Sequence, residues 1–210
     1  METRLFAIPL WLDLTAAFVG ALSGAAAAAR RKYDIIGAMV LAIVAGLGGA
    51  LMRDGLFIQN GPPGVLRNEN YILVCVATAL FLPFLKRLSS RATLLALDWT
   101  DSLALGLYGM IGTQTALLNG LGAGPAVLVG MINAVGGGLL RDLIINEEPL
   151  VFRPGNYYAA TVLAGSVLFV VLSKHADFSQ FAAGVAGVAT VVGLRAIAIR
   201  YDLRTTPLNE

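Results

Sequence analysis

Long apolar runs separated by short polar stretches occupy nearly the whole chain. Seven of these runs approach the about 20 residues that a helix needs to cross a hydrocarbon core of ~30 Å. The predicted spans are Ile8–Ala29, Ile35–Phe57, Asn70–Leu85, Leu94–Leu118, Gly122–Ile145, Tyr157–Ser173 and Phe178–Ile199. The pattern therefore predicts an all-α integral membrane protein, with seven transmembrane helices in a single transmembrane domain over residues 1–210.

Composition excludes a water-soluble protein and several kinds of chemistry. Hydrophobic residues make up 57% of the 210 residues and charged residues only 13%, whereas soluble domains carry about 25% charged residues. The single cysteine, Cys75, and the single histidine, His175, exclude a disulfide framework, a cysteine zinc site and a His-Glu-xx-His site. We expect no cofactor, no high-affinity metal site and no nucleic-acid partner. No acid, base and nucleophile converge in the sequence, so an enzyme is not expected.

Basic residues predict the orientation in the membrane. With the N-terminus outside, the segments on the cytoplasmic side hold 11 Lys and Arg residues and those on the outer side hold 4. Cytoplasmic segments of membrane proteins carry such an excess. We therefore expect the N-terminus outside and the C-terminus in the cytoplasm.

Three short motifs occur twice in the same order. Leu12-Asp13-Leu14-Thr15 recurs as Leu97-Asp98-Trp99-Thr100, and Gly48-Gly49-Ala50-Leu51-Met52-Arg53-Asp54 recurs as Gly136-Gly137-Gly138-Leu139-Leu140-Arg141-Asp142. Arg67-Asn68-Glu69-Asn70-Tyr71 recurs as Arg153-Pro154-Gly155-Asn156-Tyr157. The copies lie 85, 88 and 86 residues apart. This nearly constant spacing predicts two repeats, at about 8–88 and 94–173, followed by a seventh helix at about 178–199.

Each repeat contains three predicted helices, so the second copy enters the membrane from the opposite face. Inverted repeats of this kind place ion or substrate sites near the midplane, between matching broken helices. The seventh helix is rich in alanine and glycine, which permits close contact between helices.

The paired glycine motifs predict breaks in the second and fifth helices. Glycine costs about 1 kcal/mol relative to alanine within a helix, and a break frees backbone carbonyls that can meet a cation. The expected break residues are Gly48, Gly49, Gly136, Gly137 and Gly138. We expect Asp54 and Asp142, which follow the glycines, to face an ion pathway.

The arginines beside these aspartates have three possible roles. Arg53 and Arg141 could gate the pathway, pair with a neighbouring carboxylate or reach lipid headgroups. Adjacent residues on a helix point about 100° apart, so arginine and aspartate need not face the same side. If both pairs instead lie at the water boundary, they are ordinary polar ends of helices and the glycines only permit close packing.

Other polar residues near the helix ends and glycines leave alternatives open. Asp13 and Asp98, early in the first and fourth helices, could line a vestibule or interact favourably with the helix dipole. Asn133 precedes the second glycine motif and suits either ion binding or a hydrogen bond between helices.

The glycine and Arg-Asp motifs, the three-plus-three repeat and the additional helix resemble the bacterial members of the trimeric intracellular cation (TRIC) channel family. They also resemble bacterial proteins of a glycine-transporter domain family. The resemblance covers about residues 8–200. It implies a homotrimer with one pore in each protomer, lined by the kinked second and fifth helices, permeable to monovalent cations, chiefly potassium. Animal relatives carry a lysine-rich tail that 205–210 lacks, so regulation through that tail is not expected.

The leading hypothesis is a cation channel in which Asp54 and Asp142 attract K⁺ or Na⁺ by weak binding in the pore. No Thr-Val-Gly-Tyr-Gly filter occurs in the sequence, so modest selectivity among monovalent cations is expected. The alternative is a secondary transporter of a small zwitterion such as glycine, held at half-helix N-termini and by a carboxylate such as Asp142. A membrane scaffold would not need repeated Arg-Asp pairs. In each case membrane lipids surround the protein.

Overall fold

The computed structural model describes residues 9–85, 91–153, 157–175 and 178–203, without the side chains of 82–85, 91–98 and 175. Within these residues the chain forms seven α-helices and no strand. They are α1 (Leu10–Arg30), α2 (Ile35–Met52), α3 (Asn70–Leu85), α4 (Arg91–Leu118), α5 (Ala123–Ile144), α6 (Tyr158–His175) and α7 (Gln180–Arg200). The seven predicted helices are confirmed, with ends that differ by a few residues.

The largest difference lies at the end of the second helix. The prediction continued this helix to Phe57, but α2 ends at Met52 and the chain continues as a π-helix, η1 (Arg53–Ile58). A short 3₁₀-helix, η2 (Gly64–Leu66), follows in the connection to α3. The change of helix type occurs at the Arg-Asp pair, and π-turns inside helices frequently mark functional positions.

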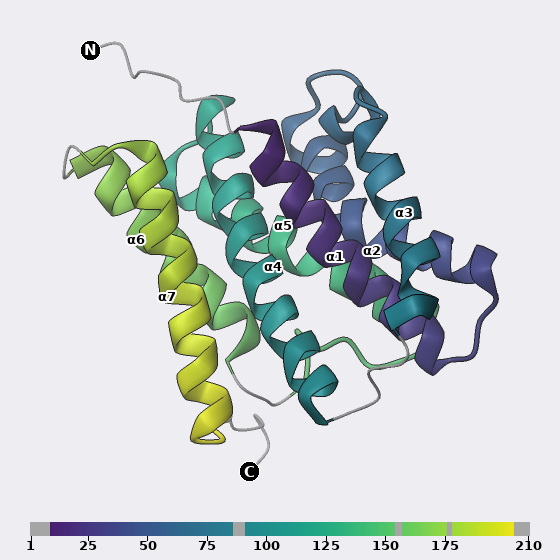
Figure 1. The fold of residues 1–210 in the computed structure, drawn as a ribbon. Helices are drawn as coiled ribbons and strands as arrows, with labels where there is room; N and C mark the ends of the chain where they lie inside the picture. The colour runs from purple at the N-terminus through teal and green to yellow at the C-terminus, as the bar shows by residue number, and fades with distance from the viewer. Residues whose placement is uncertain (1–8, 86–90, 154–156, 176–177, 204–210) are drawn as a thin grey trace.

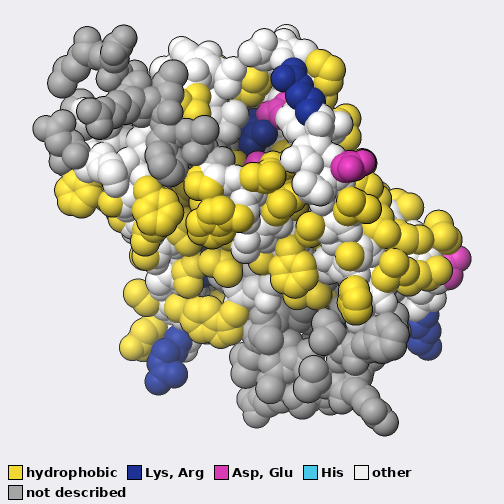
Figure 2. All heavy atoms as spheres, turned by 45° about the horizontal axis from the view of Figure 1, so that its top comes forward, with side chains coloured by type: hydrophobic (Ala, Val, Ile, Leu, Met, Phe, Trp, Pro, Cys, Tyr) yellow, Lys and Arg dark blue, Asp and Glu magenta, His cyan; other side chains and the backbone are white. Residues whose placement is uncertain are grey.

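Four of the described helices are long and apolar enough to cross a membrane: Leu10–Arg30, Ile35–Ile58, Ala123–Ile144 and Gln180–Arg200. Asn70–Phe81 and Tyr158–Lys174 are shorter apolar helices. Large hydrophobic side chains such as Trp11, Phe81 and Val185 are more than half exposed, which suits a lipid environment. Figure 2 shows hydrophobic side chains across much of the surface, with charged ones near its margins and in one depression.

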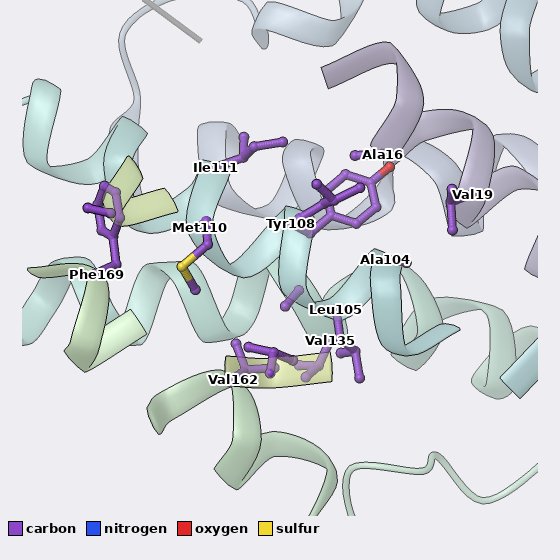
Figure 3. Packing of buried hydrophobic residues seen from close by; sticks show 14 of the residues in the cluster. Ala16, Val19, Ala104, Leu105, Tyr108, Met110, Ile111, Val135, Val162 and Phe169 are labelled. Atoms are coloured by element: carbon purple, nitrogen blue, oxygen red, sulfur yellow. The ribbon is translucent and has the colours of Figure 1, made fainter. Parts of the chain in front are cut away.

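The helices form two groups around a central pair. In Figure 1, α1, α2 and α3 lie on one side, α6 and α7 on the other, and α4 and α5 between them. Contacts of α2 with α5 and of α1 with α4 join the first group to the central pair, and contacts of α4 with α7 and of α5 with α6 join the second group to it. The buried core follows this division: one cluster includes Leu105, Val162 and Phe169, and a second includes Leu41 and Leu47. Part of the first cluster is drawn in Figure 3.

The two repeats meet at glycines, where α2 crosses α5. A Cβ atom at Gly49 would lie 2.0 Å from the carbonyl oxygen of Asn133, and one at Gly137 would lie 2.2 Å from that of Ala45. Gly137 follows Gly49 by 88 residues, and Asn133 follows Ala45 by the same number. The two contacts are thus equivalent, as expected for inverted repeats related by a pseudo-two-fold axis.

The predicted helix breaks at these glycines are wrong. The α2 helix is continuous through Gly48 and Gly49, and α5 is continuous through Gly136, Gly137 and Gly138. Glycine has no side chain at these positions, so the two backbones can approach closely. This is a frequent role of glycine between membrane helices. Because both helices continue through these positions, no half-helix terminus faces the interior there.

Candidate functional site

The first Arg-Asp pair is buried where α2 becomes η1. The Arg53 guanidinium donates from Nε to Oδ1 of Asp54 at 2.6 Å, and both side chains are nearly inaccessible. The other carboxylate oxygen of Asp54 accepts a hydrogen bond from the backbone N–H of Gly64 at 2.8 Å. The carboxylate therefore neutralises its neighbour and anchors the connection that leads to α3.

The second pair repeats this arrangement at the end of α5. Arg141 donates from Nε to Oδ1 of Asp142 at 2.7 Å, and its Nη2 lies 2.6 Å from the same oxygen. The remaining oxygen of Asp142 accepts from the backbone N–H of Leu150 at 3.4 Å. In addition, Nη1 of Arg141 donates to the Ser23 hydroxyl and so links α5 to α1.

Of the three roles considered for the arginines, local pairing is the one these contacts describe. In each pair the two side chains contact each other, although adjacent residues on a helix point about 100° apart. Both pairs are buried, and removing one partner of a buried pair typically costs 3–5 kcal/mol. Each pair thus holds a helix end and the following connection together.

A tyrosine–aspartate hydrogen bond accompanies each Arg-Asp pair. The Tyr71 hydroxyl donates to Oδ2 of Asp13 at 2.6 Å, and the Tyr158 hydroxyl makes a hydrogen bond to Asp101. Asp101 follows Asp13 by 88 residues, the spacing of the Arg-Asp pairs. The structural counterpart of Asp13 is therefore Asp101 and not Asp98, which lies one turn earlier in α4.

Two polar clusters result, one from each repeat. We call Asp13, Arg53, Asp54 and Tyr71 the first cluster, and Asp101, Arg141, Asp142 and Tyr158 the second cluster. Arg195 of α7 joins the second cluster, because its guanidinium lies 5.1 Å from the centre of the Tyr158 ring. Cations at this distance from an aromatic face are attracted to it.

A small cavity inside the protomer lies against the second cluster. Its volume is about 20 Å³, enough for a water molecule but not for a hydrated potassium ion. The lining comes from α1, α2, α4, α5 and α6, and its polar side chains are Ser23, Asp101, Tyr108, Asn133, Arg141 and Tyr158. Glycines from both repeats, including Gly49 and Gly137, complete the wall.

Some of the predicted site residues lie at this cavity and others do not. Arg141 and Asn133 line it, whereas Asp142 faces Arg141 and the connection after α5. Asn133 donates from Nδ2 to the backbone oxygen of Tyr108 at 2.6 Å, while its buried Oδ1 has no hydrogen-bond partner among the described residues. This amide therefore joins two helices, and its second polar atom is buried without a hydrogen bond to the described residues.

The remaining predictions concern the first repeat and Asp98. Arg53 and Asp54 belong to the first cluster and do not line the cavity. Asp13 is in the first turn of α1, where a negative charge is favourable, and it also accepts the Tyr71 hydrogen bond. The Asp98 side chain lies outside the described residues.

Four residues that line the cavity were not predicted from the sequence: Ser23, Asp101, Tyr108 and Tyr158. The signal that could have found Asp101 is its distance of 88 residues from Asp13, within a long apolar helix. The motif match of Leu12-Asp13 with Leu97-Asp98 gave 85 residues instead.

Comparison with known proteins places the chain in a family. The model of the family described as "Glycine transporter" matches twice, at residues 10–87 and 98–174. A UPF0126 membrane protein of Deinococcus radiodurans is 37% identical over 92% of this chain and 89% of its own. The UPF0126 inner membrane protein YadS of Escherichia coli is 29% identical over 95% of this chain and 97% of its own.

Solved structures share the fold. The trimeric intracellular cation channel orthologue from Rhodobacter sphaeroides superimposes with a TM-score of 0.85 at 30% identity, covering 92% of this chain and 98% of that one. A structure solved to explain conductance through TRIC cation channels also gives 0.85, at 24% identity and over 97% of this chain and 98% of that one. The chain therefore belongs to the glycine transporter family of membrane proteins, together with the UPF0126 proteins, and has the fold of the bacterial TRIC channels.

Proposed function

We propose that the protein is a channel for monovalent cations, permeable to potassium, with a pathway inside each protomer. The main support is the combination of a full-length match to a cation channel at 30% identity with a polar cavity inside the seven-helix body. The carboxylate of Asp101, partly buried at this cavity, attracts cations, because a low-dielectric wall strengthens its field.

The pathway runs along the α2–α5 crossing, through the cavity. Asp101 is its principal attracting group, since it reaches the cavity while Asp54 and Asp142 are held in their arginine pairs. Arg141 is the gating candidate, because its charge lies in the cavity wall. The cavity, at about 20 Å³, is too small for a hydrated ion, so conduction in this proposal requires the helices around it to separate.

Selectivity among monovalent cations is modest in this proposal. Selective potassium filters surround the dehydrated ion with rings of backbone carbonyls. The cavity instead is lined by single polar side chains, such as Asp101 and Asn133, beside an arginine. These groups distinguish cations from anions more readily than potassium from sodium.

The proposed assembly is a homotrimer in the bacterial inner membrane, with the N-terminus outside. The orthologue from Rhodobacter sphaeroides is described as trimeric, and YadS is described as an inner membrane protein. The excess of basic residues in the predicted cytoplasmic segments supports the orientation.

Single-channel recording in planar bilayers under a KCl gradient tests the function. We expect unitary currents that reverse near the potassium potential.

In Asp101→Asn, the cation current should fall by roughly tenfold, because the carboxylate field that concentrates cations is lost. Asp34→Asn is the matched control: Asp34 caps α2 by accepting from the Gly37 N–H, asparagine caps helices equally well, and the current should stay unchanged. Currents that reverse at the chloride potential, or equal currents in Asp101→Asn and wild type, would contradict the proposal.

A transporter of glycine is the second candidate, supported by the description of the matched family. The expected carboxylate site at half-helix N-termini has no counterpart, because α2 and α5 are continuous. Uptake of labelled glycine into proteoliposomes, with no current at any voltage, would favour this candidate over the channel.

A further inference from the structure

The two repeats differ strongly in side-chain size at one pair of equivalent positions. Tyr108 of α4 follows Gly20 of α1 by 88 residues, so the second repeat has a large aromatic side chain where the first has none. Tyr108 is 6% exposed. A Cβ atom at Gly20 would lie 3.3 Å from the Tyr108 ring, so the tyrosine occupies the space that its own counterpart leaves open.

Contacts fix this ring between the cavity and the first cluster. Tyr108 lines the cavity, and its hydroxyl donates to the backbone oxygen of Gly46 in α2. Figure 3 shows the side chain reaching from α4 toward Ala16 of α1. Its hydroxyl lies close enough to Asp13, Arg53 and Tyr71 for electrostatic interaction. The ring thus contacts the cavity at one end and approaches the first cluster at the other.

The polar cavity is consequently one-sided. Ser23, which binds Arg141 of the second cluster, has Ile111 as its counterpart in α4, and Ile111 is buried. Asn133 has Ala45 as its counterpart. Polar groups therefore extend the second cluster into the cavity, whereas no residue of the first cluster lines it.

We propose that Tyr108 is the plug of the pathway: its ring separates the cavity from the first cluster, and its hydrogen bond to Gly46 holds the closed state. This inference rests on the proposed cation pathway and adds a specific closing residue to it. Opening then requires the hydroxyl to leave the Gly46 oxygen and the ring to move away from Gly20.

The native cysteine provides a reporter beside the plug. Cys75 is fully buried, and its sulfur lies 2.9 Å from where a Cβ atom at Gly46 would be. Because Cys75 is the only cysteine in the sequence, a thiol reagent that reaches this region modifies a single site. Wild-type protein in nanodiscs should resist methanethiosulfonate ethylammonium.

The test compares Tyr108→Gly and Tyr108→Phe with wild type. Tyr108→Gly introduces the residue found in the other repeat and should raise the rate of Cys75 modification at least tenfold.

Tyr108→Phe keeps the ring and removes the hydrogen bond, so it should fold normally. Its open probability in planar bilayers should rise by roughly 2- to 10-fold at an unchanged unitary current, as expected for one hydrogen bond. Tyr33→Phe, an exposed tyrosine outside the helices, is the control and should match wild type in both measurements. Cys75→Ser should show no modification.

Each outcome separates the plug from the proposed function. Suppose that Cys75 in Tyr108→Gly is modified at the wild-type rate and that Tyr108→Phe has the wild-type open probability. This result would contradict the role of Tyr108 as a plug and would leave the proposed channel unaffected. If Tyr108→Gly does not fold, unchanged opening in Tyr108→Phe alone overturns it. If no variant conducts but Cys75 becomes reactive in Tyr108→Gly, the barrier is supported and the cation channel is contradicted.

Discussion

Gly137→Ala should destabilise the protein by about 3 kcal/mol or more, because the new methyl group would meet the backbone of α2. The ideal Cβ position lies 2.2 Å from the Ala45 oxygen, so α2 and α5 must separate by roughly 1 Å to reach an ordinary contact. Overpacking usually costs 1–3 kcal/mol, and backbone against backbone has no side-chain rotation to relieve it. Unfolding of the purified protein in mixed micelles with increasing denaturing detergent measures the loss.

Two further glycines make this prediction specific. Gly49→Ala should cause a similar loss, since its Cβ would lie 2.0 Å from the equivalent Asn133 oxygen. Gly124→Ala, in the same helix as Gly137, has no heavy atom within 4 Å, and should change stability by less than about 1 kcal/mol. Equal stability for Gly137→Ala and Gly124→Ala would mean that the close crossing of α2 and α5 is incorrect.

Asp142→Asn should lower the free energy of unfolding by about 3 kcal/mol. The substitution removes the carboxylate that neutralises the buried Arg141, and an uncompensated buried charge typically costs 3–5 kcal/mol. We expect the lower end of this range because Asp101 remains within electrostatic range of Arg141. The same detergent titration provides the measurement.

A double variant distinguishes charge pairing from a general effect of mutation. Arg141→Met combined with Asp142→Asn leaves no buried charge in the pair, so it should recover much of the lost stability. Glu147→Gln breaks the exposed pair with Arg31, whose N–O distance is 2.9 Å. That loss should stay below about 1 kcal/mol, as for other surface pairs. A double variant less stable than Asp142→Asn would contradict the pairing argument.

The seven helices could be predicted from the sequence because lipid imposes a simple requirement: each span must be apolar over about 20 residues. The repeat was also visible, since Gly49 and Gly137 carry matching neighbours. What glycine does at these positions could not be read from one chain. A glycine in an apolar helix suits a break and a close crossing equally well, and only the position of Ala45 and Asn133 opposite the glycines decides between them.

The candidate site was predicted in part. The Arg-Asp motifs mark the two clusters, but the cavity depends on single residues that differ between the repeats. Tyr108 and Ser23 have no motif partner, because their counterparts are Gly20 and Ile111. A search for recurring residues finds what the repeats share and overlooks what makes them different. Asp101 was missed for another reason: Asp98 lies one turn away and gave a better local match.

The equivalent contacts of Gly49 and Gly137 also bear on the ancestry of the fold. In each contact, a glycine of one repeat receives a backbone oxygen of the other, so neither repeat completes this surface by itself. A three-helix ancestor could have formed it only by pairing with a second copy inserted upside down. Such an ancestor would have needed dual topology, and gene duplication would then have allowed each copy to acquire a fixed orientation. The difference between Tyr108 and Gly20 could arise only after duplication, because both copies of a self-paired ancestor would have had the same residue at this position.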